Sequence, residues 1–420
     1  MVALDLKSGK LRWYYQMVHH DIWDYDAPSP TVLFDATING KRVAGIGEAA
    51  KTGWLYLLDR TNGQPIFPVP ERSVPQDARQ QTWPTQPIPS TAELVPHSLS
   101  VEQIAAVKKV AAEDAGSSVK ISLQKHPFTP YWKDMVVITP GNAGGTNWPP
   151  SSYSPNTHMF YVCAQAEAEG VTADTVELPK PSQVGTEYNG SVRTAGNGFG
   201  KNNGTFSAFD ATTGKIAWQK VWPGDSCFSG SVVTAGNIVF VGRNRGELQA
   251  YNATSGDLLW KFQTGAGAND VATIFQRNGH EYVAFYSGGN ALAVTPHGDN
   301  LWLFSLDGKL AEAPSPGPGQ GIEHIGGGTP HKASAAGPPN AAAGASVFAA
   351  NCSACHGATG LGGNGGPNLA TIASAKNLKR VEQQVTNGGP GMPAFSGSLT
   401  PQQIEDVSAF VVKNITHGSR

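Results

Sequence analysis

Charged residues are scarce in this chain of 420 residues, and neither sign of charge dominates. Lys, Arg, Asp and Glu together make up 15% of the sequence, and the formal net charge is −2. A nearly neutral chain lacks the basic surface that would attract a polyanion, so no nucleic acid or anionic membrane partner is expected. The sequence also contains no apolar run of about 20 residues, the length that a membrane-spanning helix needs.

Sulfur-containing residues are also few, with four cysteines and five methionines. Two of the cysteines stand in Cys352-Ser353-Ala354-Cys355-His356, the C-x-x-C-H pattern of covalent c-type haem attachment. The thiols would form thioethers with the haem and the imidazole would bind its iron, which indicates one-electron chemistry outside the cytoplasm. A zinc site needs two more ligands at close spacing, and a thioredoxin-type dithiol needs a βαβ context. The sequence around Cys352 has neither.

Met392 is the predicted second axial ligand of the haem iron, because methionine sulfur is a common ligand at this position. It stands in a loop that contains Gly and Pro, where a methionine makes few packing contacts. The alternative to an iron ligand is a methionine that fills a gap in the core. A short helix is predicted over residues 344–351. Thr400-Pro401-Gln402-Gln403 predicts a second helix that begins with a capping box and is apolar at Ile404, Val407, Val411 and Ile415. Residues 344–420 thus resemble a small all-α class I cytochrome c domain.

An 11-residue pattern recurs in the rest of the chain. It has a strand-like start, a turn centred on glycine and a terminal aromatic residue, and its copies are Ala3–Trp13, Ala208–Trp218, Ala250–Trp260 and the degenerate Leu57–Phe67. The copies that begin at Ala208 and Ala250 are separated by about the length of one four-stranded propeller blade. Together with 50 Gly and 30 Pro, this repeat predicts a mainly β, turn-rich fold.

The repeats and the changes in composition divide the chain into three parts. Residues 1–310 are predicted to form part of a β-propeller with about four blades, including a hairpin over Ser231–Gly242. A helical insertion is expected near residues 100–114, where Ser100 and Gln103 form a capping box. Residues 311–343 are rich in Pro, Gly and Ala and are predicted to be a linker.

Several motifs resemble one known family, in the order in which that family has them. The 11-residue pattern is similar to the tryptophan-docking motif of quinoproteins that bind pyrroloquinoline quinone (PQQ), whose fold is an eight-bladed propeller. His19–Asp26, Ala50–Gly53 and Gly144–Pro150 are similar to segments around the family's cofactor. A propeller followed by a cytochrome c domain resembles the quinohaemoprotein alcohol dehydrogenases.

This resemblance implies oxidation of an alcohol or sugar by hydride transfer to PQQ. Asp24 would be the general base that takes the hydroxyl proton. Lys51 would bind the quinone oxygens, Asn147 would contact the PQQ ring and Trp148 would help to wall the site. Electrons would then pass singly to the haem held by Cys352, Cys355, His356 and Met392, and on to an acceptor such as a cytochrome or the quinone pool.

The resemblance also implies a hard, oxygen-liganded cation near Asp24 and Asp26. An acid at the position of Asp26 is similar to the extra ligand of lanthanide-dependent members, but glucose-type members with calcium or magnesium share the same spacing. Calcium and a lanthanide therefore both stay open, as do an alcohol and a sugar as the substrate.

Family members carry about four blades ahead of the point that corresponds to Met1. We therefore expect the missing N-terminal half or another subunit as a partner, and a periplasmic location, although the chain shows no signal peptide. The alternative function is a non-catalytic electron-transfer cytochrome that uses an incomplete propeller as a docking scaffold. Cys163 and Cys227 are expected to form either a disulfide or two buried thiols.

Overall fold

The computed structural model describes residues 1–113, 120–175, 191–196, 202–290, 293, 295–316, 339–362, 366–388, 392, 395 and 399–416. The chain divides into two compact units, one of residues 1–173 and 197–316 and the other of residues 174–196 and 317–420. Most of the predicted linker, residues 317–338, lies outside the described residues.

The N-terminal part of the first unit contains short antiparallel sheets, in the strand orders β1-β2, β3-β4-β5 and β6-β7. Their strands are β1 (Val2–Leu4), β2 (Leu11–Tyr14), β3 (Val32–Ile38), β4 (Lys41–Ala49), β5 (Leu55–Asp59), β6 (Glu71–Ser73) and β7 (Thr85–Pro87). Helix α1 (Val101–Glu113) follows, and its start has the predicted capping contacts. The Ser100 amide donates to Gln103 Oε1 at 2.9 Å, and the Gln103 amide donates to Ser100 Oγ at 3.1 Å.

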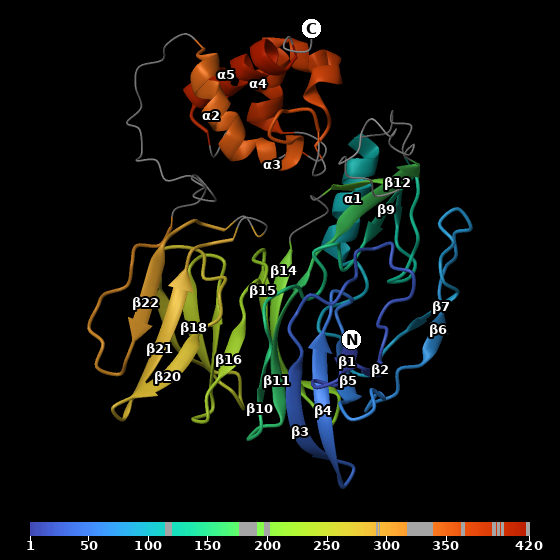
Figure 1. Ribbon diagram of the computed structural model, residues 1–420, viewed down its shortest axis with the longest axis vertical. Coiled ribbons are helices and arrows are strands. Elements are labelled where there is room, and N and C mark those ends of the chain that lie inside the picture. The colour runs from blue at the N-terminus through green and yellow to red at the C-terminus, as the bar shows by residue number, and fades with distance from the viewer. Residues whose placement is uncertain are drawn as a thin grey trace. The chain divides into compact units, whose positions relative to one another are not determined.

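Larger sheets follow along the chain, in the orders β13-β12-β9-β8, β10-β11-β14-β15, β16-β17-β18-β19 and β20-β21-β22. Their strands are β8 (Ile121–Leu123), β9 (Met135–Ile138), β10 (Ser152–Ser154), β11 (Met159–Ala166), β12 (Glu169–Thr175), β13 (Ser191–Gly196), β14 (Asn203–Asp210), β15 (Lys215–Pro223), β16 (Ser231–Val233), β17 (Ile238–Gly242), β18 (Glu247–Asn252), β19 (Leu258–Gln263), β20 (Thr273–Arg277), β21 (His280–Ser287) and β22 (Asn300–Phe304). Figure 1 shows the sheets of the first unit side by side. In the part of the chain that the structure describes they do not close into a ring, which agrees with the predicted partial propeller.

The 11-residue repeat is a β-hairpin whose first residue lies opposite its last. Ala3 pairs with Trp13, Ala208 with Trp218 and Ala250 with Trp260, and in each copy the register shifts directly after the alanine. The central glycines have positive φ angles of 66°, 70° and 74° at Gly9, Gly214 and Gly256. Glycine recurs at this position because it adopts such a conformation without the steric cost of a side chain.

The terminal tryptophan of one repeat packs on the glycine of the next. Trp13 donates its indole N–H to the Arg60 carbonyl at 2.9 Å, and a Cβ at Gly63 would lie 2.6 Å from its ring. Trp218 donates to the Ala253 carbonyl at 3.0 Å, with Gly256 equally close to its ring. The repeats therefore hold neighbouring sheets together, as predicted. A disulfide between Cys163 and Cys227 adds a covalent link and resolves the alternative that the sequence left open.

The second unit contains the helices α2 (Ala341–Asn351), α3 (Ser353–His356), α4 (Leu378–Asn387) and α5 (Pro401–Phe410). Helix α2 begins three residues earlier than predicted, because the Asn340 side chain caps it by accepting from two backbone amides. Helix α5 begins with the predicted capping box at Thr400 and continues into a π-helical turn, Val411–Ile415. Its predicted apolar residues are all buried: Ile404, Val407, Val411 and Ile415. Among the described residues, no helix is both long and apolar enough to cross a membrane.

Candidate functional site

Lys51 lies in the tight turn between β4 and β5. The turn closes when the Gly53 amide donates to the Ala50 carbonyl at 2.9 Å, and Gly53 has a φ of +80°. The Lys51 side chain is buried, yet its Nζ lies 2.6 Å from Asp26 Oδ1 and 3.3 Å from Asp24 Oδ2. Two carboxylates thus surround one buried ammonium group, which is the arrangement that a buried charge needs.

Asp24 is held between two buried aromatic residues. Trp23 donates its indole N–H to the Thr129 carbonyl at 2.8 Å, and Tyr25 donates its hydroxyl to the Pro140 carbonyl at 2.6 Å. Asp24 itself is half exposed and has a φ of +66°, a conformation that few residues other than glycine adopt. The buried aromatic rings therefore fix an acidic side chain at a strained backbone position, as is common at functional sites.

The loop that carries Asn147 and Trp148 packs directly on the Lys51 turn. The Gly145 amide donates to the Lys51 carbonyl at 2.7 Å, and a Cβ at Gly144 would lie 2.4 Å from the Lys51 side chain. Asn147 donates to the Ala143 carbonyl at 2.8 Å and accepts from the Trp148 amide at 2.9 Å, so its amide shapes the loop. The Gly-Gly sequence is what allows this close approach of two backbones.

These residues meet at one cavity of about 410 Å³ in the first unit. The predicted residues Asp24, Lys51, Asn147 and Trp148 all line it. Asp26 is not among the lining residues and is connected to the cavity through its ion pair with Lys51. The volume suits a small-molecule ligand, and Trp148 stacks on Phe228 at 5.3 Å to make one flat wall.

Six further polar or aromatic residues line this cavity and were not predicted from the sequence: Asn142, Gln165, Glu167, Asn202, Ser226 and Phe228. Burial raises the pKa of Glu167. A hydrogen bond from Asn202 at 3.2 Å lowers it by a smaller amount. Both amide atoms of Gln165 are buried and have no hydrogen-bond partner among the described residues. A contact between strand β11 and the Gly145 loop brings Gln165 here, since the backbone N–H of Gln165 donates to the Gly145 carbonyl at 2.7 Å. No local sequence pattern marks such a contact.

The described residues do not assemble a metal site. Nowhere in the described ranges do three or more His, Cys, Asp or Glu side chains come together as possible ligands. The two carboxylates that were expected to hold a cation instead pair with Lys51. Asp24 and Asp26 alone do not fit a calcium or lanthanide ion, which takes at least six oxygen ligands, so the metal assignment stays a prediction.

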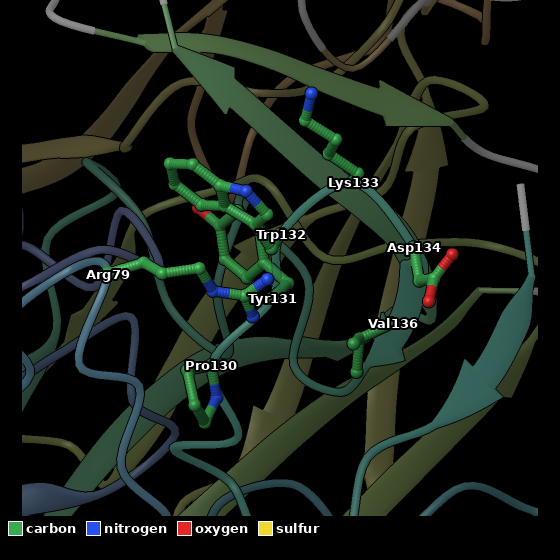
Figure 2. A pocket seen from close by; sticks show the side chains of 7 residues that line it. All are labelled: Arg79, Pro130, Tyr131, Trp132, Lys133, Asp134 and Val136. Carbon is green, nitrogen blue, oxygen red and sulfur yellow. The ribbon is translucent and has the colours of Figure 1, made fainter.

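A second cavity of about 450 Å³ opens beside residues 130–136, and Figure 2 shows the side chains that line it. Arg79 lies there with its guanidinium carbon 5.3 Å from the centre of the Trp132 ring. The same guanidinium makes two hydrogen bonds to Asp77, at 2.9 and 2.5 Å. This cavity contains none of the predicted site residues, so the first cavity is the better candidate.

Of the haem-attachment residues in the second unit, Cys352 stands between α2 and α3, and Cys355 and His356 lie on α3. Cys352 is buried, Cys355 is exposed, and both are free thiols. Burial raises the pKa of the Cys352 thiol to about 12, and the nearby Cys355 contributes a smaller part of this shift. His356 is buried, and its Nδ1 lies 3.0 Å from the Pro367 carbonyl. An Nδ1–H that donates to this carbonyl leaves Nε2 unprotonated and able to bind iron.

Met392 packs against the same apolar cluster that contains Cys352 and Phe348. Its sulfur lies 3.8 Å from Gln384 Nε2, so it accepts a weak hydrogen bond. A methionine, a histidine with a free Nε2 and two free thiols in one small helical unit fit a covalently bound haem.

Family comparisons agree with both parts of the chain. Residues 1–200 match the glucose/ethanol/alcohol dehydrogenase β-propeller family, and residues 339–411 match the family of the cbb3-type cytochrome c oxidase subunit III. Residues 179–316 match a second propeller family, described as outer membrane protein assembly factor BamB.

Individual relatives show the same combination. Quinohemoprotein alcohol dehydrogenase ADH IIB of Pseudomonas putida is 27% identical over 98% of this chain and 55% of its own length. The quinohemoprotein alcohol dehydrogenase of Comamonas testosteroni is 28% identical over 98% of this chain and 54% of its own length. The crystal structure of the Comamonas testosteroni enzyme matches with a TM-score of 0.55 and 27% identity, covering 100% of this chain and 57% of that one.

The chain thus spans about half the length of the curated relatives it matches. The match to each domain, in the same order, confirms the resemblance that the sequence motifs predicted. The chain thus resembles the quinohemoprotein alcohol dehydrogenases, in which a PQQ-type propeller is joined to a cytochrome c domain.

Proposed function

We propose that this chain is the catalytic and electron-exit part of a PQQ-dependent dehydrogenase that oxidises an alcohol or a sugar. The observation that carries the proposal is the cavity of about 410 Å³ that Asp24, Lys51, Asn147 and Trp148 line together. These residues come from three distant segments of the chain, and each stands in a short sequence motif. The C-x-x-C-H site in the second unit supports the second half of the function, transfer of electrons to haem c.

PQQ, when bound, supplies an ortho-quinone that accepts two electrons from the substrate carbon. Lys51 Nζ would donate hydrogen bonds to the quinone oxygens, and its fixed charge would favour electron uptake there. Trp148, stacked on Phe228, would hold the flat ring, and the unpartnered amide of Gln165 supports a polar ligand in the cavity. The second amide hydrogen of Asn147 is available to such a ligand.

Asp24 would accept the hydroxyl proton of the substrate on a carboxylate oxygen. Its half-exposed side chain leaves room for a substrate, and its Oδ2 lies 3.3 Å from Lys51 Nζ. The neighbouring carboxylate of Asp26 also pairs with Lys51 and prevents that single ammonium group from neutralising Asp24 completely. The substrate itself, an alcohol or a sugar, is not distinguished by these contacts.

Electrons would leave through the haem held by Cys352, Cys355, His356 and Met392, toward an external acceptor such as a cytochrome or the quinone pool. Covalent haem attachment and the disulfide Cys163–Cys227 support an oxidising compartment, which we propose is the periplasm. Further blades, from another part of the protein or from another subunit, would complete the ring and add ligands for a cation.

A second candidate function is electron transfer without catalysis. It is favoured by one observation: the described residues hold no group of three metal ligands. In that case the propeller part would serve as a docking scaffold for the cytochrome.

The test is substrate-driven haem reduction by the full chain, purified from a host that makes PQQ. We expect bound quinone and reduction of the haem by an alcohol or a sugar. Asp24→Asn should lower the rate of substrate-driven reduction at least about 100-fold, the scale of general base catalysis, while dithionite still reduces the haem. Asp307→Asn, whose side chain is 82% exposed, is the matched control and should behave like the wild type. A haem that is reduced by dithionite alone, with no bound quinone, would favour the second function.

A further inference from the structure

All three carbonyl groups of the turn Lys51-Thr52-Gly53 are held from outside the turn. The Lys51 carbonyl accepts from the Gly145 amide at 2.7 Å, and the Gly53 carbonyl accepts from the Leu94 amide at 2.9 Å. The Thr52 carbonyl is different, because its partner is a side chain: His97 Nε2 lies 2.5 Å from it. One of the three external contacts that hold the Lys51 turn is therefore made by a histidine ring.

That ring is itself fixed on two more sides. It stacks on Trp54, with ring centres 3.9 Å apart and planes inclined by 22°. Its Nδ1 lies 3.0 Å from Glu93 Oε1, in an ion-pair contact, and the His97 side chain is only 6% exposed. The stacking and the two polar contacts leave the ring little freedom to turn.

Both ring nitrogens of His97 face oxygen atoms that can only accept, a backbone carbonyl and a carboxylate. A neutral imidazole carries one N–H and would turn a lone pair toward one of these oxygens. The doubly protonated ring donates to the carbonyl through Nε2 and places its positive charge beside the carboxylate, which Nδ1 approaches without the geometry of a hydrogen bond. We propose that His97 is a positioning residue that acts as an imidazolium clamp between Glu93 and the Thr52 carbonyl, and so holds Lys51 at its place in the cavity. The inference rests on the proposed function to the extent that the cavity ligand is PQQ.

The titratable groups around the ring agree with this charge. The His97 ring beside Glu93 holds the pKa of that carboxyl below its usual range. The other group is His126, whose pKa is lowered by burial and, next, by His97. Thr52, Gly53, Trp54 and Val95 add no charge, and the ammonium of Lys51 is already paired with Asp24 and Asp26.

The sign of the pH dependence follows from these contacts. The depressed pKa of Glu93 means that its part of the clamp is present above the ordinary pKa of a glutamate and is lost on acidification. A neutral His97 ring would turn a lone pair toward the Thr52 carbonyl or the Glu93 carboxylate, and the Lys51-Thr52-Gly53 turn would then be held less firmly. The Glu93 part of the clamp is therefore lost at low pH.

The experiment measures the dissociation constant of PQQ and the protonation of His97 on the full chain, from about pH 5 to about pH 9. The variants are His97→Gln, which keeps an amide donor at the place of Nε2, His97→Phe, which keeps only the stacking, and Glu93→Gln. His280→Gln is the control, because that histidine side chain is 63% exposed. A ¹⁵N spectrum of the histidine rings reports protonation without PQQ.

We expect the wild type to bind PQQ more weakly as the pH rises, at the pH where His97 loses its second proton in the spectrum. At neutral pH His97→Phe should weaken binding about tenfold or more, the scale of a lost charged hydrogen bond, and His97→Gln should weaken it less and without a pH step. Glu93→Gln should move the step to lower pH, because it removes the charge that stabilises the imidazolium. Failure of the wild type to bind PQQ would overturn the proposed function and this role together. Normal PQQ binding with a neutral His97 ring near pH 6, or with unchanged affinity in His97→Phe, would overturn the clamp alone.

Discussion

Lys51 joins the two parts of the candidate site, because its one ammonium group contacts both Asp24 and Asp26. Removing that charge would leave two carboxylates close together with no counterion, and the PQQ oxygens without their donor. Lys51→Met should therefore weaken PQQ binding about 10- to 100-fold, as expected for hydrogen bonds to a charged group. A quinone absorbance titration measures this. Lys261→Met, which removes an exposed surface lysine, is the control, and equal affinities of the two variants would contradict the role of Lys51.

Glu48 gives a separate prediction at the scale of one residue. It is almost fully buried, its Oε1 has no partner among the described residues, and burial raises its pKa to about 8. A raised carboxyl pKa means that stability is lost as the pH rises from the ordinary glutamate pKa of 4.5 to about 8. Glu48→Gln should thus raise Tm at pH 8 by at least about 2 °C and leave it nearly unchanged at pH 4. Thermal unfolding at the two pH values checks this, and an equal effect at both would contradict the assignment.

The site residues that stand in short motifs could be predicted from the sequence. Those that lie at the site only because distant segments contact each other could not. Asp24, Lys51, Asn147 and Trp148 were selected by their motifs, and the structure brings all four to one cavity. Gln165 reaches the same cavity through a contact with a loop 20 residues away, at Gly145. Neither composition nor spacing predicts such a contact. The role of His97 could not be predicted for the same reason, because it depends on a contact with the distant Thr52 carbonyl.

At the scale of secondary structure, the 11-residue hairpin was predictable because its residues are consecutive. The glycine turn and the terminal aromatic residue are visible in the sequence. Two features were not: the register shift after the first alanine, and the glycine on which each tryptophan packs. Helix α2 begins earlier than predicted for a similar reason. Asn340 is its N-cap, and the strength of a cap depends on side-chain geometry.

Two glycines of this repeat allow a matched test of tryptophan docking. Gly9 and Gly256 have similar φ angles, 66° and 74°, but a Cβ at Gly256 would lie 2.6 Å from the Trp218 ring, whereas one at Gly9 meets nothing within 4 Å. Gly9→Ala should cost about 1 kcal/mol for its backbone conformation. Gly256→Ala should cost a further 1–3 kcal/mol or so, because it also displaces the ring. Urea unfolding measures both, and equal losses would mean that the docking contact adds no stability.

At the scale of the whole molecule, the sequence predicted a mainly β part followed by a helical haem domain, and the family comparisons confirm this order. The disulfide between Cys163 and Cys227 was not predictable, because 64 residues separate the two cysteines and the sequence does not say which strands are neighbours. This chain matches about half the length of its relatives, and its described residues contain no group of three or more possible metal ligands.

The central claim is that PQQ binds in the cavity that Asp24, Lys51, Asn147 and Trp148 line. A crystal structure of the full chain grown with PQQ tests it most directly. We predict the quinone oxygens within hydrogen-bond distance of Lys51 Nζ, the ring against Trp148, and a carboxylate oxygen of Asp24 facing the reactive carbonyl. PQQ bound in the cavity beside Arg79 and Trp132, or a cavity at Lys51 that stays without PQQ at saturating concentration, would contradict the account.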